Sequence, residues 1–252
     1  MTDIDAVLFD LFETLITVDH ARLKAISFGD NLVPSTAGTV LSLLRTAAPD
    51  FSKDALIAAM AETRAQPQVR SEPNAEIPEH HFFIALLPRL GLADPGDILA
   101  RRLADAQMAA IVAACRPMPG ARSLLASLRR RGIRTGVVSN LAHAQSLDAL
   151  LAIVDPEHRF DAAVASIEVG FCKPDQRPFQ MALARLKIDS NRTLHVGDDP
   201  RDDVAGAMHA GIRPVWFNPS GRLWPYAGER PTTVWAFEEI ETLLGPPGSP
   251  TV

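Results

Sequence analysis

Short, nearly continuous apolar runs recur along the chain, at residues 5–10, 133–139, 161–166, 193–197 and 213–217. Runs of this length without polar alternation are typical of strands that are buried on both faces. The intervening segments carry apolar residues at helical spacing, at 121–131, 145–153, 179–186 and 204–209. Strands that alternate with helices in this way predict an α/β fold with a doubly wound, mostly parallel sheet.

Residues 17–116 follow a different pattern. Their apolar residues recur at helical spacing, and no β-branched run stands out among them. We therefore predict a mainly helical domain over 17–116, inserted into a core domain formed by residues 1–16 and 117–244. The proline-containing stretch 66–78 is predicted to be a loop of this insertion, and residues 245–252, which lack periodicity, a flexible tail.

Composition narrows the classes of protein that this chain can represent. Apolar residues make up 47% and charged residues 22% of its 252 positions, which is a globular balance. The formal charge of −5 opposes binding to nucleic acid, which requires a basic excess. No apolar run reaches the length of a membrane helix, so we expect no membrane partner. The 2 cysteines and the acidic first residues favour a reducing cytoplasm, and we expect a monomer or a homodimer.

Reactive side chains follow the predicted strands at the ends where ligands bind in parallel α/β sheets. Asp10 comes directly after the first apolar run, and Ser139 and Asn140 end the second. Lys173 follows the third, and an aspartate-rich segment, 198–203, follows the fourth. Together they offer a carboxylate nucleophile, a hydroxyl donor, a fixed cation and an acidic cluster, a set that suits phosphoryl transfer.

An anionic carboxylate that attacks a phosphate needs counter-charge. Two like charges about 4 Å apart repel by about 4 kcal/mol at an effective dielectric constant of about 20. A Mg²⁺ ion held by Asp10 and the acidic segment would reduce this repulsion, since Mg²⁺ prefers oxygen ligands. Lys173 would neutralise a second charge, and Ser139 would donate to a phosphate oxygen.

These motifs, taken in order, resemble those of the haloacid dehalogenase superfamily of hydrolases. The family pattern comprises an aspartate followed four residues later by threonine, a strand-terminal Ser or Thr, a Lys-Pro-Asp motif, and Gly-Asp followed four residues later by a further Asp. It is matched here by Asp10 with Thr14, Ser139, Lys173-Pro174-Asp175, and Gly197-Asp198 with Asp203. The helical insertion is similar to the family's first-position (C1) cap, which closes over the active site and selects the substrate.

The resemblance implies roles for the nucleophile and for the metal ligands. Asp10 is identified as the nucleophile that forms an aspartyl-phosphate, which water then hydrolyses. Mg²⁺ is expected to bind Asp10, Asp198 and the backbone carbonyl of Phe12. Asp203 is expected to act on the metal directly or through a bound water.

The resemblance also implies which residues hold the substrate. Ser139 and Asn140 are expected to bind the phosphate, while Lys173 pairs with both the phosphate and Asp10. Thr14 is expected to support the turn that follows the nucleophile.

One position departs from the phosphatases of the family. They usually carry aspartate where Phe12 stands, as the general acid for the leaving oxygen. Such acid–base help is worth roughly 10²- to 10⁴-fold in rate. The insertion offers Glu79, His80 and His81 as substitutes. An aromatic residue at this position is instead similar to the 2-haloacid dehalogenase branch, in which halide leaves without protonation and no metal is used.

The aspartates of segment 198–203 favour the phosphatase, because four carboxylates would repel a halide and a substrate carboxylate. We therefore expect a Mg²⁺-dependent hydrolase of small phosphorylated metabolites. A metal-free dehalogenase and a weakly active or non-catalytic binding relative stay open as alternatives. The sequence does not identify the substrate. It also leaves two roles open, core packing or a subunit contact, for the aromatic residues near the end of the chain, Trp216, Trp224, Tyr226 and Trp235.

Overall fold

The computed structural model describes residues 4–28, 31–66, 71–157 and 159–244. The predicted tail, 245–252, and residues 67–70 of the predicted loop lie outside them. The strands are β1 (Ala6–Phe9), β2 (Ile16–Val18), β3 (Ala25–Phe28), β4 (Asn31–Pro34), β5 (Cys115–Pro117), β6 (Arg134–Ser139), β7 (Ala162–Ala165), β8 (Thr193–Gly197), β9 (Arg213–Phe217) and β10 (Thr233–Val234). The α-helices are α1 (Thr36–Ala47), α2 (Lys53–Ala65), α3 (His80–Leu86), α4 (Ile98–Ala114), α5 (Ala121–Arg130), α6 (Leu147–Val154), α7 (Ser166–Val169), α8 (Gln176–Leu186), α9 (Gly206–His209) and α10 (Phe237–Leu243).

The chain divides into two compact units. The core unit comprises Met1–Thr17, Asn74–Glu76 and Arg116–Val252, and the inserted unit comprises Val18–Pro73 and Ile77–Cys115. The predicted insertion, 17–116, is wrong for the short segment Asn74–Glu76, which belongs to the core unit. Backbone pairing is the reason, because Ala75 forms an antiparallel bridge with Phe171 and the Cys172 N–H donates to the Asn74 carbonyl at 2.8 Å.

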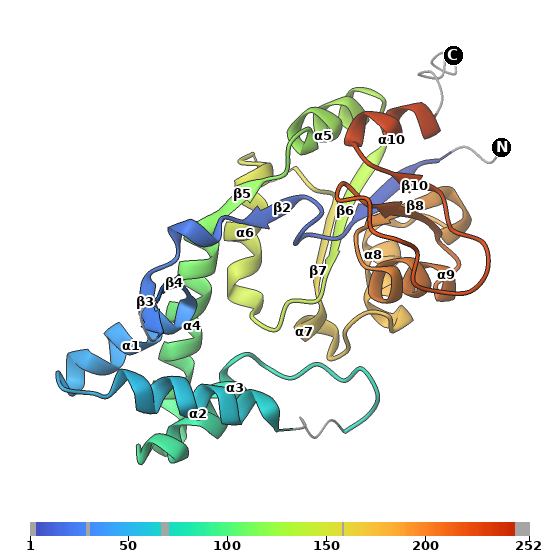
Figure 1. Cartoon of the computed structure of the whole chain (residues 1–252). Coiled ribbons are helices and arrows are strands. Elements are labelled where there is room, and N and C mark those ends of the chain that lie inside the picture. Colours follow the sequence, from blue (N-terminus) through green and yellow to red (C-terminus); the bar gives the residue numbers. More distant parts are fainter. Residues whose placement is uncertain (1–3, 29–30, 67–70, 158, 245–252) are drawn as a thin grey trace. The chain divides into compact units, whose positions relative to one another are not determined.

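The core unit is built on a six-stranded sheet in the order β10-β9-β8-β1-β6-β7 (Figure 1). Every pair of neighbours within it is parallel, so the α/β fold predicted from the apolar runs is confirmed. Strand β1 lies between β6 and β8, with Phe9 opposite Val137 on one side and Val196 on the other. The carboxyl ends of these three strands therefore meet at one edge of the sheet, where the candidate residues were expected.

Helices cover the sheet on both faces. On one face, α8 and α9 bring Phe179 and Ala207 against Leu8 of β1 and Val138 of β6. On the other side, α5 packs on β6 and α10 lies beside α5 (Figure 1). All four residues of β1 are fully buried, which explains why this strand shows no polar alternation.

The inserted unit has its own core, formed by buried residues of α1 to α4 such as Val40, Leu56, Phe83 and Leu103. Beside its helices, the inserted unit contains β3 and β4, an antiparallel hairpin that the helical spacing did not predict. Within β3, Ile26 is buried and its neighbour Ala25 is exposed. Strands of 4 residues, of which β4 is exposed throughout, are too short to stand out as β-branched runs in the sequence.

The aromatic residues near the end of the chain fall into two groups. Trp216 is fully buried, and Trp224 and then Tyr226 follow it in successive edge-to-face contacts, each with ring centroids 5.3 Å apart. Trp235 is 47% exposed and lies under the Arg230 guanidinium. Core packing therefore accounts for Trp216. Among the described residues, no helix combines the length and the hydropathy needed to cross a bilayer.

Candidate active site

Asp10 lies at the point where β1 ends and the chain turns. Its backbone N–H donates to the Val196 carbonyl at 2.9 Å, which continues the sheet pairing by one residue. The turn is then closed by the Leu15 and Ile16 N–H groups, which both donate to the Leu11 carbonyl at 2.9 Å. Thr14 is fully buried in this turn, and its hydroxyl has no hydrogen-bond partner among the described residues.

Lys173 joins the ends of three strands through its ammonium group. Nζ lies 2.5 Å from Oδ1 of Asp10, 2.6 Å from Oδ1 of Asp203 and 2.9 Å from the Val138 carbonyl oxygen. The side chain is 2% exposed. Because an ammonium has three protons, these three acceptors satisfy it completely.

Asn140 fixes the backbone of Lys173. The Lys173 N–H donates to Oδ1 of Asn140 at 2.7 Å, and Nδ2 of Asn140 donates to the Lys173 carbonyl at 3.2 Å and to Asp202 at 3.1 Å. Both side-chain amide protons of Asn140 are thus used within the protein, and the phosphate contact expected for Asn140 stays a prediction. Ser139, one residue earlier, is buried at the end of β6.

The segment after β8 turns so that Asp203 faces back toward the sheet. Asp199 caps the π-helical segment Pro200–Ala205 by accepting from the Arg201 and Asp202 N–H groups at 2.8 Å and 2.7 Å. The Asp199 N–H in turn donates to Oδ2 of Asp203 at 3.0 Å. A Cβ at position 197 would overlap the carboxylate of Asp203, and this explains the glycine there.

His195 is a site residue that the sequence reasoning missed. It lies in the middle of β8, fully buried, and its Nε2 is 3.1 Å from Oδ1 of Asp203. Burial lowers the pKa of His195, and Nε2 is the donor to Asp203 because an ionised carboxylate can only accept. The signal that could have found it is a histidine inside a continuous apolar run, two residues before Gly197.

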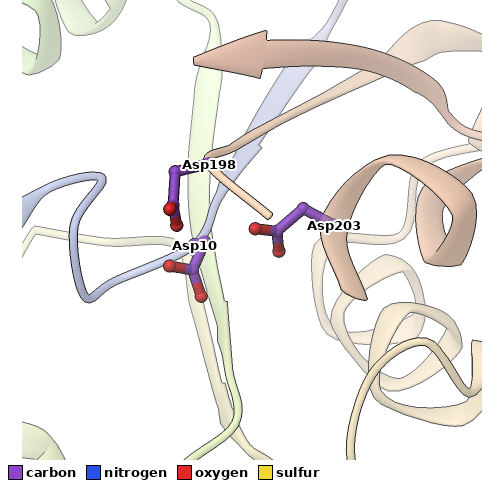
Figure 2. A group of neighbouring side chains, drawn as sticks. All are labelled: Asp10, Asp198 and Asp203. Carbon is purple, nitrogen blue, oxygen red and sulfur yellow. The ribbon is translucent and has the colours of Figure 1, made fainter. Parts of the chain in front are cut away.

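The carboxylates of Asp10, Asp198 and Asp203 converge, as Figure 2 shows. Each offers an oxygen that lies within 4.8 Å of the others. A cavity of about 150 Å³ adjoins them within the core unit. The cavity is lined by Asp10, Phe12, Ser139, Asn140, Lys173, Asp198, Asp199, Asp202 and Asp203.

Negative charge is under-compensated in this cluster. Burial raises the pKa of Asp10 to about 7, with Asp203 and Asp198 adding to the effect and Lys173 opposing it. Burial likewise raises the pKa of Asp198 to about 6. At Asp203, burial is outweighed by Lys173 and His195, which hold the pKa below its ordinary value. Lys173 itself stays protonated, because Asp10 and Asp203 outweigh its burial and raise its pKa.

These residues fit a divalent cation with a preference for oxygen. The donor set consists of carboxylates alone, which is the ligand chemistry of Mg²⁺. Three carboxylates face one buried ammonium, so a dication would offset the excess negative charge, which adds to burial in raising the pKa values of Asp10 and Asp198. Asp203 already accepts three hydrogen bonds, from Lys173, His195 and Asp199, and so has the least capacity left for a direct metal bond.

Comparison with known proteins identifies relatives that are named as phosphatases and relatives that are named as haloacid dehalogenases. A family model described as haloacid dehalogenase-like hydrolase matches residues 4–211. Pyrimidine 5'-nucleotidase YjjG of Escherichia coli (strain K12) is 34% identical over 168 residues, which are 66% of this chain and 71% of that protein. (S)-2-haloacid dehalogenase 2 of Pseudomonas sp. (strain CBS-3) is 31% identical over 130 residues, which are 51% of this chain and 56% of the relative.

Similarity to solved structures extends over the whole fold. The crystal structure of a 2-haloacid dehalogenase from Pseudomonas syringae pv. Tomato DC3000 superposes with a TM-score of 0.69 at 25% identity. The match covers 96% of this chain and 98% of that one. The relatives thus share the fold and hydrolytic chemistry, and they divide between phosphate esters and haloacids.

Proposed function

Because the chain belongs to the haloacid dehalogenase-like hydrolase family, we propose that it is a Mg²⁺-dependent phosphatase that hydrolyses a small phosphorylated metabolite. The observation that carries the proposal is the convergence of Asp10, Asp198 and Asp203 on one cavity. A site that receives halide and a substrate carboxylate needs positive or neutral surroundings, whereas a site for a dication needs this excess of carboxylates.

In this proposal Asp10, Asp198 and the backbone carbonyl of Phe12 hold the Mg²⁺, and Asp203 supports it directly or through water. The bound ion would supply the positive charge that lets an anionic carboxylate approach a phosphate dianion. Lys173 adds a second positive charge, fixed 2.5 Å from Asp10. Asn140 and Val138 keep that ammonium in place by binding the backbone and Nζ of Lys173.

The reaction divides into two displacements at phosphorus. A carboxylate oxygen of Asp10 forms a bond to phosphorus while the bond from phosphorus to the leaving alkoxide oxygen breaks. A water then attacks the same phosphorus, the bond to Asp10 breaks with its electrons returning to the carboxylate, and phosphate is released. The alkoxide takes one proton and the attacking water loses one, so the net reaction consumes one water. Ser139, buried beside the cavity, is the donor for a phosphoryl oxygen.

Phe12 lines the cavity where a general acid would stand, and it cannot protonate the leaving oxygen. Glu79, His80 and His81, the substitutes suggested from the sequence, belong to the inserted unit, where Glu79 accepts from Gln107 at 2.7 Å. Because Phe12 itself supplies no proton, we expect the enzyme to favour phosphates whose leaving group is stable without protonation.

The presence of Phe12 also favours a second candidate function, 2-haloacid dehalogenase activity. In that case Asp10 would form an ester by displacing halide from carbon, and water would hydrolyse the ester. Because halide leaves without taking up a proton, the absence of a general acid at Phe12 would not slow this reaction. The relative from Pseudomonas sp. (strain CBS-3) carries this activity in its name.

Parallel assays separate the two functions. The purified protein is incubated with 4-nitrophenyl phosphate and with 2-chloropropionate, each with Mg²⁺ and each with a chelator. We expect phosphate release that requires Mg²⁺ and disappears in Asp10→Asn. Chloride release that persists in chelator would instead identify the dehalogenase, and neither activity, with any substrate in a panel of phosphate esters, would identify a non-catalytic relative.

A further inference from the structure

Arg222, which belongs to none of the sequence motifs described above, binds Asp198. Its Nη2 lies 2.5 Å from the Asp198 backbone carbonyl oxygen and 3.0 Å from Oδ2 of the carboxylate. Arg222 follows β9, and its side chain is 47% exposed, while that of Asp198 is 21% exposed. Arg222 is therefore a partly exposed cation at the solvent side of the carboxylate cluster, whereas Lys173 is a buried one.

Hydrogen bonds hold the backbone of Arg222 in place. The buried side chain of Asn218 donates from Nδ2 to the Arg222 carbonyl at 2.8 Å and accepts from the Arg222 N–H at 2.9 Å. Asn218 is itself tied to β10, because its N–H donates to the Val234 carbonyl at 2.8 Å. The Asp198 carbonyl also accepts from Nε1 of Trp216 at 2.9 Å. Both partners of the Arg222–Asp198 pair are thus fixed by the fold.

This pair has an electrostatic consequence for any cation bound by Asp198. Asp10 and Asp203 share Lys173 as counter-charge, whereas the ion pair that Asp198 forms within the described residues is with Arg222. A guanidinium at 3.0 Å from the carboxylate offsets its charge in the metal-free protein. The same guanidinium repels a dication that approaches the other carboxylate oxygen, and the repulsion persists when the ion is bound.

We propose that Arg222 sets the Mg²⁺ affinity of the site, by stabilising Asp198 when the metal is absent and by weakening metal binding. The inference rests on the proposed function, since it takes Asp198 as a ligand of Mg²⁺. Arg222 does not itself line the cavity, and it contacts Asp198 rather than the nucleophile, so it is a positioning residue rather than a catalytic one. It makes metal loading responsive to the Mg²⁺ concentration, because a weaker site is filled only partly when the ion is scarce.

Binding measurements test this without reference to turnover. Mg²⁺ is titrated into the metal-free protein by isothermal calorimetry, and the melting temperature is recorded with and without the ion. For Arg222→Gln we expect a Kd about three- to tenfold lower than that of the natural protein and a lower melting temperature without metal. In high salt the difference in Kd should shrink, because the partly exposed charge is screened.

Two matched variants separate charge from loss of structure. Arg222→Lys keeps the positive charge and should restore a Kd close to that of the natural protein. Arg213→Gln removes the same charge from the opposite end of β9, where the residue is exposed, and should leave the Kd unchanged.

The outcomes distinguish this inference from the function on which it rests. If the natural protein binds no Mg²⁺, the proposed function and this inference both fail. If the natural protein binds Mg²⁺ but folded Arg222→Gln binds it equally well or more weakly, the inference about Arg222 is overturned while the proposed function stands. An equal gain in Arg213→Gln would also overturn it, because the effect would then come from net charge alone.

Discussion

Nζ of Lys173 lies 2.5 Å from Oδ1 of Asp10, although the two residues are 163 positions apart in the chain. Both side chains are almost completely buried, at 2% and 11% exposure. Removing charges from water is costly, and such a pair is favourable only when its partners are held in good geometry. The fold meets that condition by bringing the ends of β1, β6 and β8 around one ammonium.

Removal of this ammonium should destabilise the protein strongly. Lys173→Met leaves Asp10 and Asp203 buried without their cation, and the free energy of unfolding should fall by about 3–5 kcal/mol in urea titrations at neutral pH. The control is Lys53→Met, which removes an ion pair to the exposed Asp54 and should cost less than about 1 kcal/mol. Equal losses of unfolding free energy in the two variants would show that the buried ion pairs of Lys173 stabilise the protein no more than an exposed pair does.

The stability of the metal-free protein should depend on the ionisation of Asp10, and Asp10→Asn should remove this dependence. The pKa of Asp10 is about 7 in the folded state and 3.8 in the unfolded chain. Between these values the unfolded state ionises first, so rising pH lowers the stability of the natural protein. We therefore expect the natural protein to lose stability relative to Asp10→Asn as the pH rises from about 4 to about 8.

Urea titrations in chelator across this pH range measure the effect. Asp54→Asn, at an exposed carboxylate, is the control and should show no comparable trend. A difference between Asp10→Asn and the natural protein that does not change with pH would contradict the assignment of the raised pKa to Asp10.

Phe12→Asp should supply the missing acid. A carboxyl group at this position lines the same cavity as Asp10 and can protonate a leaving oxygen. For an alkyl phosphate such as glycerol phosphate, kcat should rise roughly tenfold or more. For 4-nitrophenyl phosphate, whose leaving group needs no proton, the change should be small. Phe12→Asn provides the isosteric control, and the same gain in that variant would rule out acid catalysis as the cause.

Gly197→Ala should disrupt the acidic segment 198–203 although it replaces none of the aspartates. The added Cβ overlaps the side chain of Asp203, which would have to leave Lys173 and His195. We expect a loss of about 1–3 kcal/mol in stability and of at least about 10²-fold in kcat. In an Asp203→Gly background the added methyl group has no side chain to displace. The further loss of stability should therefore be small there, and a full loss would refute the steric explanation.

Much of the core unit was predictable because its strands are buried on both faces. The runs at 193–197 and 213–217 coincide with β8 and β9, and the other three runs differ from the observed strands by one residue at one or both ends. Motif spacing also placed Asp10, Lys173 and Asp198 at the same sheet edge, since parallel strands bring their carboxyl ends together. The hydrophobic pattern is enough to predict the strands, and the position of each motif directly after a strand is enough to predict the shared sheet edge.

The remaining features depend on contacts that no local pattern encodes. The segment Asn74–Glu76 joins the core unit through backbone pairing with the chain around Phe171, which leaves no trace in side-chain periodicity. Nothing in the sequence distinguishes Arg222 from the other arginines. Its role depends on the hydrogen bonds by which Asn218 holds it beside Asp198. For Asn140, no local pattern indicates that its side-chain amide binds Lys173 and Asp202.

A crystal structure of the protein with Mg²⁺ and tetrafluoroberyllate, a phosphate mimic, tests the central claim most directly. We predict one Mg²⁺ bound by Asp10 and Asp198, and a beryllium fluoride group attached to the other carboxylate oxygen of Asp10 within reach of Ser139 and Lys173. An ion-free cluster at saturating Mg²⁺, with Asp10 unmodified and still paired to Lys173, would contradict the account.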